Sequence, residues 1–510
     1  MGTAAYQSLC LRIDPRARAS LQLQIYDGIR RAILEGVVAP SAQLLSSRAL
    51  AADLGVSRTT TVLAYEQLLA EGYLQARRGS GTFVASALPD DLPQTIVVHP
   101  GATPKHPPLS RRGAVLATVP AAARRLAGPA RAFRLGIPAL DLFPIKQWSQ
   151  LVNRRLRSAT LAQLDYSHPA GVRALREAIA DHVCTARGTK CTADQVIVVA
   201  GAQRGLDLIC NVLLDAGDEA WVEDPGYPGM RAALIACGAR IRPVRVDDHG
   251  AVVERLARIA PHARLGYVTP SHQFPTGVPM SLSRRLALLR WASSAGAWIV
   301  EDDYDSEFRY GSRPIPCLHG LDGDGRVIYV GTFSKVLFPS LRLGFLIVPA
   351  DLHDRLVAVR RATDLHPPAL DQLVLADFMN AGHFDRHIRR MRSVYGERLE
   401  VLASAATRYC GGALRLRPAH TGLHAVADVD GVEAAAVSAQ AEARGVEVMP
   451  LSEYWLGRPA GRDGLMLGFA AVRPDALNKG MERLADAIEA AADGGLQRGR
   501  SSVAAVERRR

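Results

Sequence analysis

Short apolar runs alternate with longer amphipathic stretches over residues 135–490. The runs QVIVVA, RLGYVTP, AWIVEDD, RVIYVGT and LGFLIV are rich in β-branched residues and end at glycine, proline or acidic residues. Such runs are typical of buried strands, and the stretches between them are long enough for helices. Strands alternating with helices favour βαβ units. The pattern therefore predicts an α/β domain with a mostly parallel sheet over residues 135–490.

A different pattern occupies residues 8–86. Ser47 is expected to cap a helix that ends at Gly55, where the chain turns sharply. Ser57 begins a second helix whose core positions are Val62, Tyr65, Leu68 and Leu69. The following GYLQARRGSGTFV predicts two short strands joined by a basic, glycine-rich turn. Together these elements predict an α+β winged helix-turn-helix.

Two parts of this predicted unit are suited to double-stranded DNA. The second helix offers Arg58, Thr59 and Thr60 at its exposed first turn, which in helix-turn-helix proteins meets base edges in the major groove. Arg77 and Arg78 lie in the hairpin turn, where they suit contacts to phosphates or the minor groove. The alternative is a small domain that serves only protein contacts.

The net charge of +12 is placed unevenly along the 510 residues. It divides into +3 over residues 1–86, +5 over residues 87–134 and +4 over residues 495–510, so the region between them is neutral. Residues 87–134 are rich in Pro, Ala and Arg and predict a flexible basic linker, and residues 491–510 predict a disordered basic tail. Basic ends suit a polyanion such as DNA, although solvated tails have the same composition.

Composition narrows the classes of protein further. A chain of 510 residues is expected to form two or more domains. No apolar run is long enough to span a bilayer, and the start MGTAAYQSLCLRIDPR lacks the layout of a signal peptide. The seven cysteines are scattered without a CxxC pair, which argues against a disulfide framework or a zinc site. We expect a cytoplasmic protein with no membrane partner.

One lysine lies where chemistry is expected. Only five of the 62 basic residues are lysines, and Lys335 follows the apolar run VIYV in the turn GTFSKVLFPSLRLGF. An amine forms an imine with an aldehyde, which a guanidinium group does not do usefully. Thr332 and Ser334 lie beside it and Arg342 follows seven residues later, so hydroxyls and a planar cation are available to hold a phosphate.

Two other segments supply matching groups. The segment QVIVVAGAQRGLDL predicts a strand, a glycine turn and a helix, whose first backbone N–H groups over residues 201–203 form a second phosphate-binding element. The segment AWIVEDDYDSEFRY places Glu301, Asp302, Asp303 and Asp305 at the carboxyl end of a strand, where open α/β sheets bind ligands. An amine, a phosphate cradle and a carboxylate for a pyridinium nitrogen together indicate pyridoxal 5'-phosphate.

The whole chain resembles the MocR/GabR-like regulators, which join a GntR-type winged helix to a fold-type I aminotransferase-like domain. The quoted pieces that carry the resemblance are LLSSRALAADLGVSRTTTVLAYEQLLAEGYL, GSGTFV, YSHPAGVRALREAIA, EDPGYPG, TPSHQFPTG, EDDYDSEFRY and GTFSKVLFPSLRLGF. The resemblance implies a large α/β domain, a smaller C-terminal α/β subdomain and a homodimer. It also implies DNA contacts from Arg48, Ser57, Arg58, Thr59 and the Arg77–Gly79 turn. A departure is LLSSR, where the family usually has Leu-Pro before the serines.

The resemblance also implies a role for each cofactor-binding residue. Lys335 forms the internal aldimine, Asp302 pairs with the pyridinium nitrogen, and Tyr304 lies near the phenolic oxygen of the cofactor. Tyr227 stacks on the ring, and Tyr166 reaches the phosphate of the partner subunit. The phosphate is held by Arg342, Thr332, Ser334 and the backbone amides of Ala202 and Gln203.

Two departures point away from an ordinary aminotransferase. Phe274 stands where these enzymes commonly carry an Asn that bonds the phenolic oxygen, and Tyr304 or Gln273 is left to substitute for it. Met466 stands where a late Arg clamps the substrate carboxylate, and a thioether cannot hold an anion. Either Arg462 or Arg473 compensates, or the effector lacks an α-carboxylate.

The resulting hypothesis is a transcriptional regulator that binds operator DNA and senses a small amine or amino acid by external aldimine formation. One alternative is a working aminotransferase with an appended DNA-binding domain. Another is a regulator whose second domain is a dimerisation module without a cofactor.

Overall fold

The computed structural model separates the chain into two units, residues 1–107 and residues 108–510. The described residues are 11, 13–17, 19–77, 80–88, 109–119, 128, 130–311, 315–457 and 463–507, with side chains described up to position 493. No helix in these ranges is long and apolar enough to cross a membrane.

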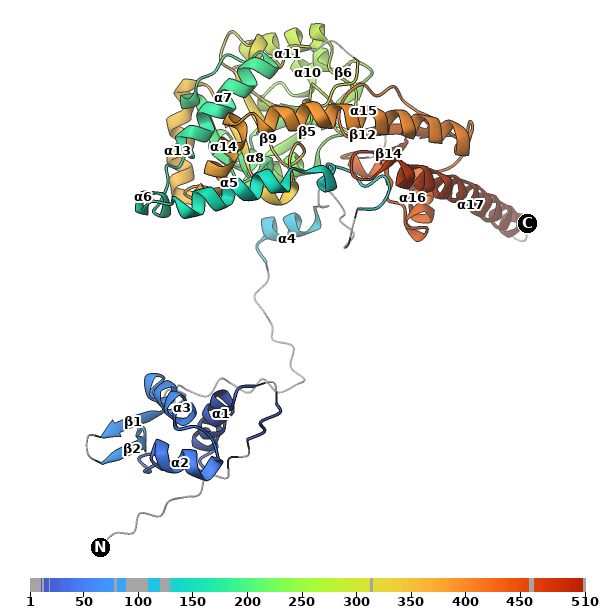
Figure 1. Ribbon diagram of the computed structural model, residues 1–510. Coiled ribbons are helices and arrows are strands. Elements are labelled where there is room, and N and C mark those ends of the chain that lie inside the picture. Colours follow the sequence, from blue (N-terminus) through green and yellow to red (C-terminus); the bar gives the residue numbers. More distant parts are fainter. Residues whose placement is uncertain are drawn as a thin grey trace. The chain divides into compact units, whose positions relative to one another are not determined.

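The first unit consists of three helices and a hairpin (Figure 1). Its elements are α1 (Leu21–Leu34), α2 (Ser47–Leu54), α3 (Arg58–Ala70), β1 (Leu74–Arg77) and β2 (Gly81–Val84). The antiparallel β1–β2 pair forms the expected wing. The prediction that Ser47 caps α2 is wrong by one residue, because the cap is Ser46, whose Oγ accepts a hydrogen bond from the Ala49 N–H at 3.2 Å.

The helix-turn-helix is held together by apolar packing and one buried hydroxyl. Gly55 ends α2 with a φ of 67°, a left-handed conformation that glycine adopts without strain. Tyr65 and Leu68 of α3 are buried against Ile25 and Ile29 of α1. The buried Thr61 Oγ1 donates a hydrogen bond to the Ser47 carbonyl at 2.8 Å and so fixes α3 against the start of α2.

The second unit is built on an eight-stranded sheet in the order β3-β10-β9-β8-β7-β4-β5-β6. The five strands from β9 to β5 are parallel, whereas β10 and β6 run antiparallel to their neighbours. In chain order the bounds are β3 (Val196–Val199), β4 (Glu219–Asp224), β5 (Arg240–Asp247), β6 (Gly250–Ala251), β7 (Ala263–Val268), β8 (Trp298–Asp303), β9 (Val327–Thr332) and β10 (Gly344–Ile347). The predicted mostly parallel sheet is confirmed.

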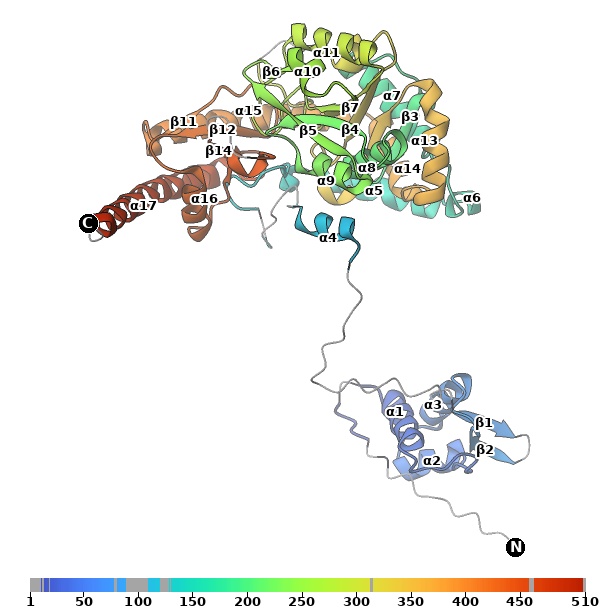
Figure 2. The same ribbon diagram turned by 180° about the vertical axis from the view of Figure 1, so that it is seen from behind.

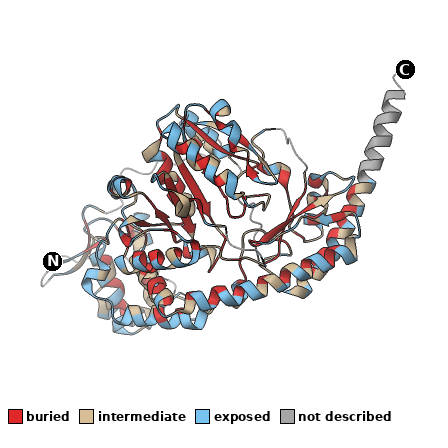
Figure 3. Cartoon of the chain, turned by 90° about the horizontal axis from the view of Figure 1, so that it is seen from above, coloured by how far each residue is buried: buried red, intermediate tan, exposed pale blue. Residues whose placement is uncertain are grey.

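Helices cover both faces of this sheet (Figures 1 and 2). The reason is visible in β3, where Val196 and Val198 belong to one apolar cluster and Ile197 and Val199 to another on the opposite face. Apart from β5, whose residues are mostly exposed or half-buried, the strands are buried almost throughout, while the helices alternate buried and exposed positions (Figure 3). The helices of this part are α5 (Ile145–Arg157), α6 (Leu161–Leu164), α7 (Arg173–Arg187), α8 (Ala202–Leu213), α9 (Pro228–Cys237), α10 (Leu256–Ile259), α11 (Leu282–Ala295), α12 (Leu318–Leu321), α13 (Ala350–Thr363) and α14 (Ala369–Asn380).

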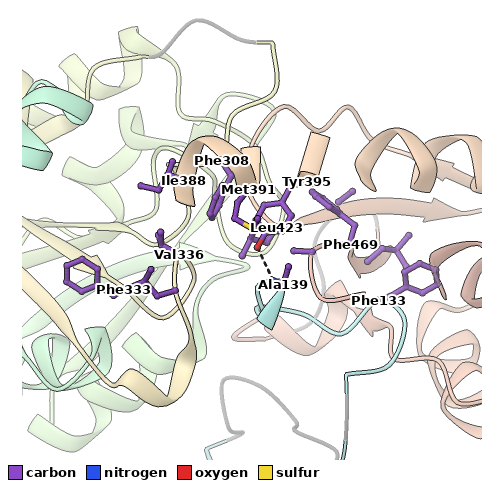
Figure 4. Packing of buried hydrophobic residues seen from close by; sticks show 14 of the residues in the cluster. Phe133, Ala139, Phe308, Phe333, Val336, Ile388, Met391, Tyr395, Leu423 and Phe469 are labelled. Carbon is purple, nitrogen blue, oxygen red and sulfur yellow. Dashed lines mark hydrogen bonds between the residues drawn. The ribbon is translucent and has the colours of Figure 1, made fainter. Parts of the chain in front are cut away.

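A smaller C-terminal subdomain carries a four-stranded antiparallel sheet in the order β11-β12-β14-β13. Its elements are α15 (His383–Cys410), β11 (Leu414–Leu416), β12 (His424–Val429), α16 (Ala434–Ala443), β13 (Met449–Pro450), β14 (Leu465–Gly468) and α17 (Pro474–Glu507). One apolar cluster runs from the large domain into this subdomain (Figure 4). Within it the Ala139 N–H donates a hydrogen bond to the Tyr395 hydroxyl at 2.9 Å, so the two parts share one core.

Two segments differ from the sequence-based expectation. Within the predicted flexible linker, Arg111–Thr118 form the helix α4, which contacts α9, and Phe133 is fully buried. Within the predicted disordered tail, α17 continues to Glu507. Alanine has a high intrinsic helix propensity, so a stretch rich in Ala and Arg can form a helix without a regular apolar face. The hydrophobic pattern of such a stretch therefore does not distinguish a short helix from a linker.

Candidate cofactor site and nucleic-acid interface

Lys335 lies in the turn that follows β9, at the carboxyl edge of the sheet. Its Nζ donates a hydrogen bond to the Gly136 carbonyl at 2.9 Å. Gly136 has a φ of 69°, and a Cβ at this position would lie 2.7 Å from the lysine Nζ. A glycine here therefore leaves room for the amine, which is half-buried.

Asp302 lies on the neighbouring strand, β8, at the same edge. The registers of β8 and β9 pair Asp303 with Gly331, so both strands end together. The Tyr267 hydroxyl donates to Asp302 Oδ2 at 2.7 Å, whereas the buried Oδ1 has no hydrogen-bond partner. Burial raises the pKa of Asp302 to about 7, against the opposing effects of the Tyr267 hydrogen bond and the nearby Lys335 charge.

The carboxylates on either side of Asp302 have other partners. Glu301 accepts hydrogen bonds from the N–H groups of Leu318 and His319, each at 2.9 Å. Asp303 forms a buried ion pair with Arg187. Burial raises the pKa of Asp303, but the Arg187 charge and the hydrogen bonds from Ser306, Tyr329 and Arg187 together outweigh this effect, and the net shift of the pKa is downward. Asp302 and Asp303 each have an Oδ1 without a hydrogen-bond partner, but Asp303 pairs with Arg187 and has a lowered pKa, whereas the pKa of Asp302 is raised.

A phosphate cradle lies beside these groups. Gly201 precedes α8 with a φ of 86°, and no side chain caps the start of that helix. A Cβ on Gly201 would lie 2.9 Å from the Arg342 guanidinium, whose Nη2 donates to the Ala200 carbonyl at 3.2 Å. Arg342 thus lies against the N-terminal end of α8, where Ala202 and Gln203 begin the helix.

The turn before Lys335 completes the cradle. The Thr332 Oγ1 accepts a hydrogen bond from the Ser334 N–H at 3.2 Å. Arg342 has a φ of 51°, a left-handed conformation that is uncommon for a residue with a side chain. Such backbone strain persists where the surrounding structure requires it, and it often marks functional sites.

Aromatic rings form another side of the site. The Tyr227 ring packs edge-on against Phe274 at 5.7 Å between centroids, and Phe274 lies 6.1 Å from the ring of Tyr304. Gly229 makes this possible, because a Cβ there would lie 2.4 Å from the Tyr227 ring and 2.1 Å from Gln203 Oε1. The starts of α8 and α9 therefore meet at Tyr227.

Tyr304 and Gln273 were both expected as substitutes for the Asn that Phe274 replaces. The Tyr304 hydroxyl lies 3.0 Å from His272 Nδ1, and His272 in turn contacts Asp305 at 3.1 Å. Gln273 is committed to its own loop, since its amide donates to the Pro225 and Phe274 carbonyls and to Glu223, and accepts from Thr276. The amide of Gln273 is thus used within its loop, and Tyr304 remains the expected substitute.

The position of the expected carboxylate clamp is apolar. Met466 is fully buried on β14, among Val426, Leu451 and Tyr454. Of the two arginines considered as replacements, Arg473 is 73% exposed and pairs with Asp141 at 3.2 Å, on the surface. Arg462 lies outside the described residues.

Tyr166 stays apart from the rest of the predicted site. Its side chain is 81% exposed, and its ring contacts His366 at 6.3 Å between centroids. Within one chain it therefore joins none of the groups around Lys335, and its role in a partner subunit stays a prediction.

Three groups in the site were missed by the sequence interpretation. They are Tyr267, which bonds Asp302, the Gly136 carbonyl, which bonds Lys335, and His272, which contacts Tyr304. Tyr267 lies inside the predicted strand RLGYVTP, so its place beside Asp302 was open to strand-pairing arguments. No local pattern marks the other two.

The predicted DNA-contacting residues that the structure describes lie on α2, at the start of α3 and at the end of β1. Ser57, Arg58 and Thr59 are exposed at the start of α3, as is Arg48 on α2. Thr60 is half-buried, and its hydroxyl bonds the Ser57 Oγ at 2.7 Å. Arg77 is exposed at the end of β1, with its guanidinium 4.7 Å from the Phe83 ring centroid. Arg78 and Gly79 lie outside the described residues.

The residues around Lys335 fit pyridoxal phosphate. The unpartnered Asp302 Oδ1 is an acceptor without a donor, which a protonated ring nitrogen would supply. The uncapped start of α8 and the Arg342 guanidinium suit a phosphate, and glycine at position 201 keeps space between them. An amine, a carboxylate and a phosphate cradle thus meet at one edge of the sheet.

Comparisons with known proteins agree with this arrangement. Residues 132–484 match the family described as aminotransferase class I and II, and residues 21–84 match bacterial regulatory proteins of the gntR family. The α-aminoadipate aminotransferase LysN of Thermus thermophilus, solved with N-(5'-phosphopyridoxyl)-L-leucine, has a TM-score of 0.64 and 27% identity, over 75% of this chain and 95% of that one.

Regulators match over both units. The chain is 40% identical over 481 residues to the probable rhizopine catabolism regulatory protein MocR of Rhizobium meliloti, covering 94% of this chain and 96% of that protein. It is 34% identical to the transcriptional regulator TauR of Rhodobacter capsulatus, over 93% of this chain and 98% of that protein. The chain therefore belongs to the MocR-like GntR-family transcriptional regulators, which join a winged helix to an aminotransferase-like domain.

Proposed function

We propose that this regulator binds pyridoxal phosphate at Lys335 and uses it to sense a small amine or amino acid. The observation that carries the proposal is the buried Asp302 Oδ1, which has no partner beside the Lys335 amine. A buried carboxylate in this state is unfavourable unless a cationic donor arrives, and a pyridinium N–H is such a donor.

Each residue of the site has a task in this proposal. Pyridoxal phosphate supplies an aldehyde that condenses with primary amines. Lys335 would provide the amine that holds it, Asp302 would accept the ring N–H, and Tyr304 would donate to the phenolic oxygen. Tyr227 lies against the ring, and the phosphate is bound by Arg342, Thr332, Ser334 and the amides of Ala202 and Gln203.

The effector amine then competes with Lys335 for the same aldehyde. With an effector amine in its place, Lys335 would no longer be held by this bond, and the two subdomains around it would change their equilibrium arrangement. This population shift is coupled to the affinity of the winged helix for double-stranded operator DNA. The family assignment and the exposed Arg48, Ser57, Arg58 and Thr59 support the DNA-binding half of the proposal.

We further propose a homodimer that acts in the cytoplasm, on the nucleoid when bound to DNA. Support comes from Tyr166, whose aromatic side chain is 81% exposed, because a partner subunit would cover this ring. In the dimer it would reach the phosphate of the partner site. The likeness to MocR, a probable regulator of rhizopine catabolism, suggests control of a catabolic gene set.

An active aminotransferase is the second candidate, favoured by the fold it shares with LysN. Two apolar residues argue against an active aminotransferase. Phe274 stands in place of the Asn that bonds the phenolic oxygen in such enzymes, and Met466 stands in place of the Arg that binds the substrate carboxylate. Keto acid released in amounts beyond one per site, from any amino donor tested, would establish turnover and favour this candidate.

The cofactor proposal is tested by chemical trapping. Full-length protein incubated with pyridoxal phosphate and then borohydride should carry the cofactor on the peptide that contains Lys335. Lys335→Ala should lack this adduct and the visible absorbance. Attachment at Lys146 or Lys190 instead, or none at all, would overturn the proposal.

A further inference from the structure

Three side chains form a hydrogen-bonded relay that begins at Tyr304. The Tyr304 hydroxyl lies 3.0 Å from His272 Nδ1, and the same nitrogen lies 3.2 Å and 3.1 Å from the two carboxylate oxygens of Asp305. Asp305 Oδ2 also accepts a hydrogen bond from the Leu423 N–H at 3.3 Å. His272 is 3% exposed and Asp305 is 1% exposed, so water competes little for these contacts. The relay therefore runs from the cofactor site to the start of the small sheet.

The partners of His272 Nδ1 decide where its hydrogen lies. A carboxylate accepts hydrogen bonds and does not donate them, so Nδ1 must carry the hydrogen that faces Asp305. The same N–H is within reach of the Tyr304 oxygen, which can accept it as a shared bond. The hydroxyl hydrogen of Tyr304 cannot point at a nitrogen that already carries one. It is therefore directed away from the imidazole.

This hydrogen of Tyr304 is available to a ligand. Among the residues that the structure describes, the Tyr304 hydroxyl has no hydrogen-bond partner besides His272, and the neighbouring ring of Phe274 offers no acceptor. Burial raises the pKa of Tyr304 well above its usual value, and four carboxylates raise it further, those of Asp305, Asp302, Glu223 and Asp303. Tyr304 thus stays protonated near neutral pH and keeps one hydrogen to donate.

The His272 ring is held in place from two further sides. The His424 ring packs against it at 4.7 Å between centroids, and His424 Nε2 lies 3.1 Å from the Pro275 carbonyl. Burial lowers the pKa of His424 to about 3, and the nearby Lys335 charge acts in the same direction, so His424 is neutral and does not compete for Asp305. Gly422 has a φ of 81°, and a Cβ there would lie 2.2 Å from His272 Nδ1. The backbone at Gly422 therefore closes on the imidazole.

We propose that His272 and Asp305 are positioning residues, which hold the Tyr304 hydroxyl in the orientation that donates to the phenolic oxygen of the cofactor. This inference rests on the proposed function and deepens it. Because Phe274 supplies no donor to that oxygen, the orientation of Tyr304 decides how well the oxygen is stabilised.

The visible absorbance of the bound cofactor reports this orientation. A hydrogen bond to the phenolic oxygen stabilises it most when it carries a full negative charge, so a well-aimed donor lowers the pH at which the cofactor loses its proton. Loss of that donation should therefore raise the pH midpoint of the absorbance change. The expected rise is about 1 pH unit, the scale of one hydrogen bond to a charged group.

The test compares two replacements of His272 in cofactor-loaded full-length protein. His272→Phe keeps a flat ring without an N–H and should raise the pH midpoint by about 1 unit. His272→Asn places an amide N–H near the position of Nδ1 and should keep a midpoint close to that of wild type. The control is His182→Phe on α7, where the histidine packs against Phe384, and it should leave the midpoint unchanged.

A double variant shows whether His272 acts through Tyr304. Tyr304→Phe should raise the midpoint by itself, and His272→Phe should add nothing in that background, because both remove the same hydrogen bond. Asp305→Asn provides a second route if His272→Phe fails to fold. Its amide can donate to Nδ1 as well as accept from it, so the N–H on Nδ1 is no longer required and the midpoint should rise.

The outcomes separate the positioning role from the proposed function. An unchanged midpoint in Asp305→Asn or in folded His272→Phe, or an equal rise from His272→Phe with and without Tyr304, would overturn the positioning role and leave cofactor binding intact. Wild-type protein that gains no visible absorbance with pyridoxal phosphate would refute the proposed function itself.

Discussion

Replacement of Asp302 by Asn should stabilise the protein without its cofactor and weaken its hold on the cofactor. Asp302 is 5% exposed, with one oxygen bonded to Tyr267 and the other without a hydrogen-bond partner. Asn keeps an acceptor for the Tyr267 hydroxyl and carries no charge. It therefore removes the cost of burying an unpaired carboxylate and also the group that would pair with a pyridinium.

The magnitude follows from the pKa of Asp302. Burial raises this pKa from 3.8 to about 7, which corresponds to a ceiling of about 4 kcal/mol. Because the folded state holds the proton more tightly than the unfolded state, the contribution of Asp302 to stability falls as pH rises from about 4 to about 7. Cofactor-free Asp302→Asn should thus be more stable than wild type at about pH 8 and nearly equal to it at about pH 4.

The adjacent Asp303 provides a matched control on the same strand. Asp303→Asn also exchanges a carboxylate for an amide, but it leaves the buried Arg187 charge unpaired. Loss of one partner of a buried ion pair costs about 3–5 kcal/mol, so this variant should be less stable than wild type. Two neighbouring substitutions of the same kind are expected to act in opposite directions.

The assay is thermal unfolding of the second unit without cofactor at two pH values, followed by titration with pyridoxal phosphate. The unpaired pyridinium in Asp302→Asn should weaken cofactor binding by about 1.5–3 kcal/mol, the contribution of a hydrogen bond to a charged group. The reasoning is refuted if Asp302→Asn is no more stable than wild type at the higher pH, or if it binds the cofactor as tightly.

Other predictions concern the DNA-binding helix α3, the phosphate cradle and the loop that contains Gln273. Arg58→Ala should weaken operator binding by about 1–3 kcal/mol in a fluorescence anisotropy assay, and Arg31→Ala on α1 should have a smaller effect; equal losses would argue against α3 as the recognition helix. Gly201→Ala places a Cβ 2.9 Å from the Arg342 guanidinium at a φ of 86°, and should weaken cofactor binding about tenfold or more. Unchanged cofactor affinity in Gly201→Ala would contradict the assigned phosphate cradle. Gln273→Ala should lower the melting temperature by breaking the loop bonds to Glu223 and Thr276, with the absorbance of bound cofactor unaltered; an altered band would support a direct cofactor role for Gln273.

The winged helix and the parallel sheet were predictable because both rest on local patterns. Ser57, the start of α3 and the glycine turn at 201 are fixed by capping and by left-handed φ values, which act within a few residues. The cap of α2 was missed by one position because Ser46 and Ser47 are chemically equivalent in the sequence, and only the backbone conformation separates them.

The site was predictable only in part, for a physical reason. Lys335, Asp302 and Arg342 could be predicted because each lies in a sequence motif, and the motifs follow one another in a characteristic order. Their partners Tyr267 and Gly136 could not be predicted in this way, because strand pairing and a loop distant in sequence bring them to the site. The engagement of Gln273 depends on several long-range bonds at once, which no local pattern encodes.

The central claim is that amine binding at Lys335 and operator binding are coupled. The most direct measurement titrates a primary amine into cofactor-loaded full-length protein on operator DNA, following visible absorbance and DNA affinity in one solution. The account predicts that both change with the same half-saturation, and that saturating operator DNA shifts the amine affinity by the same factor. Saturation of the absorbance change while DNA affinity stays constant would contradict it.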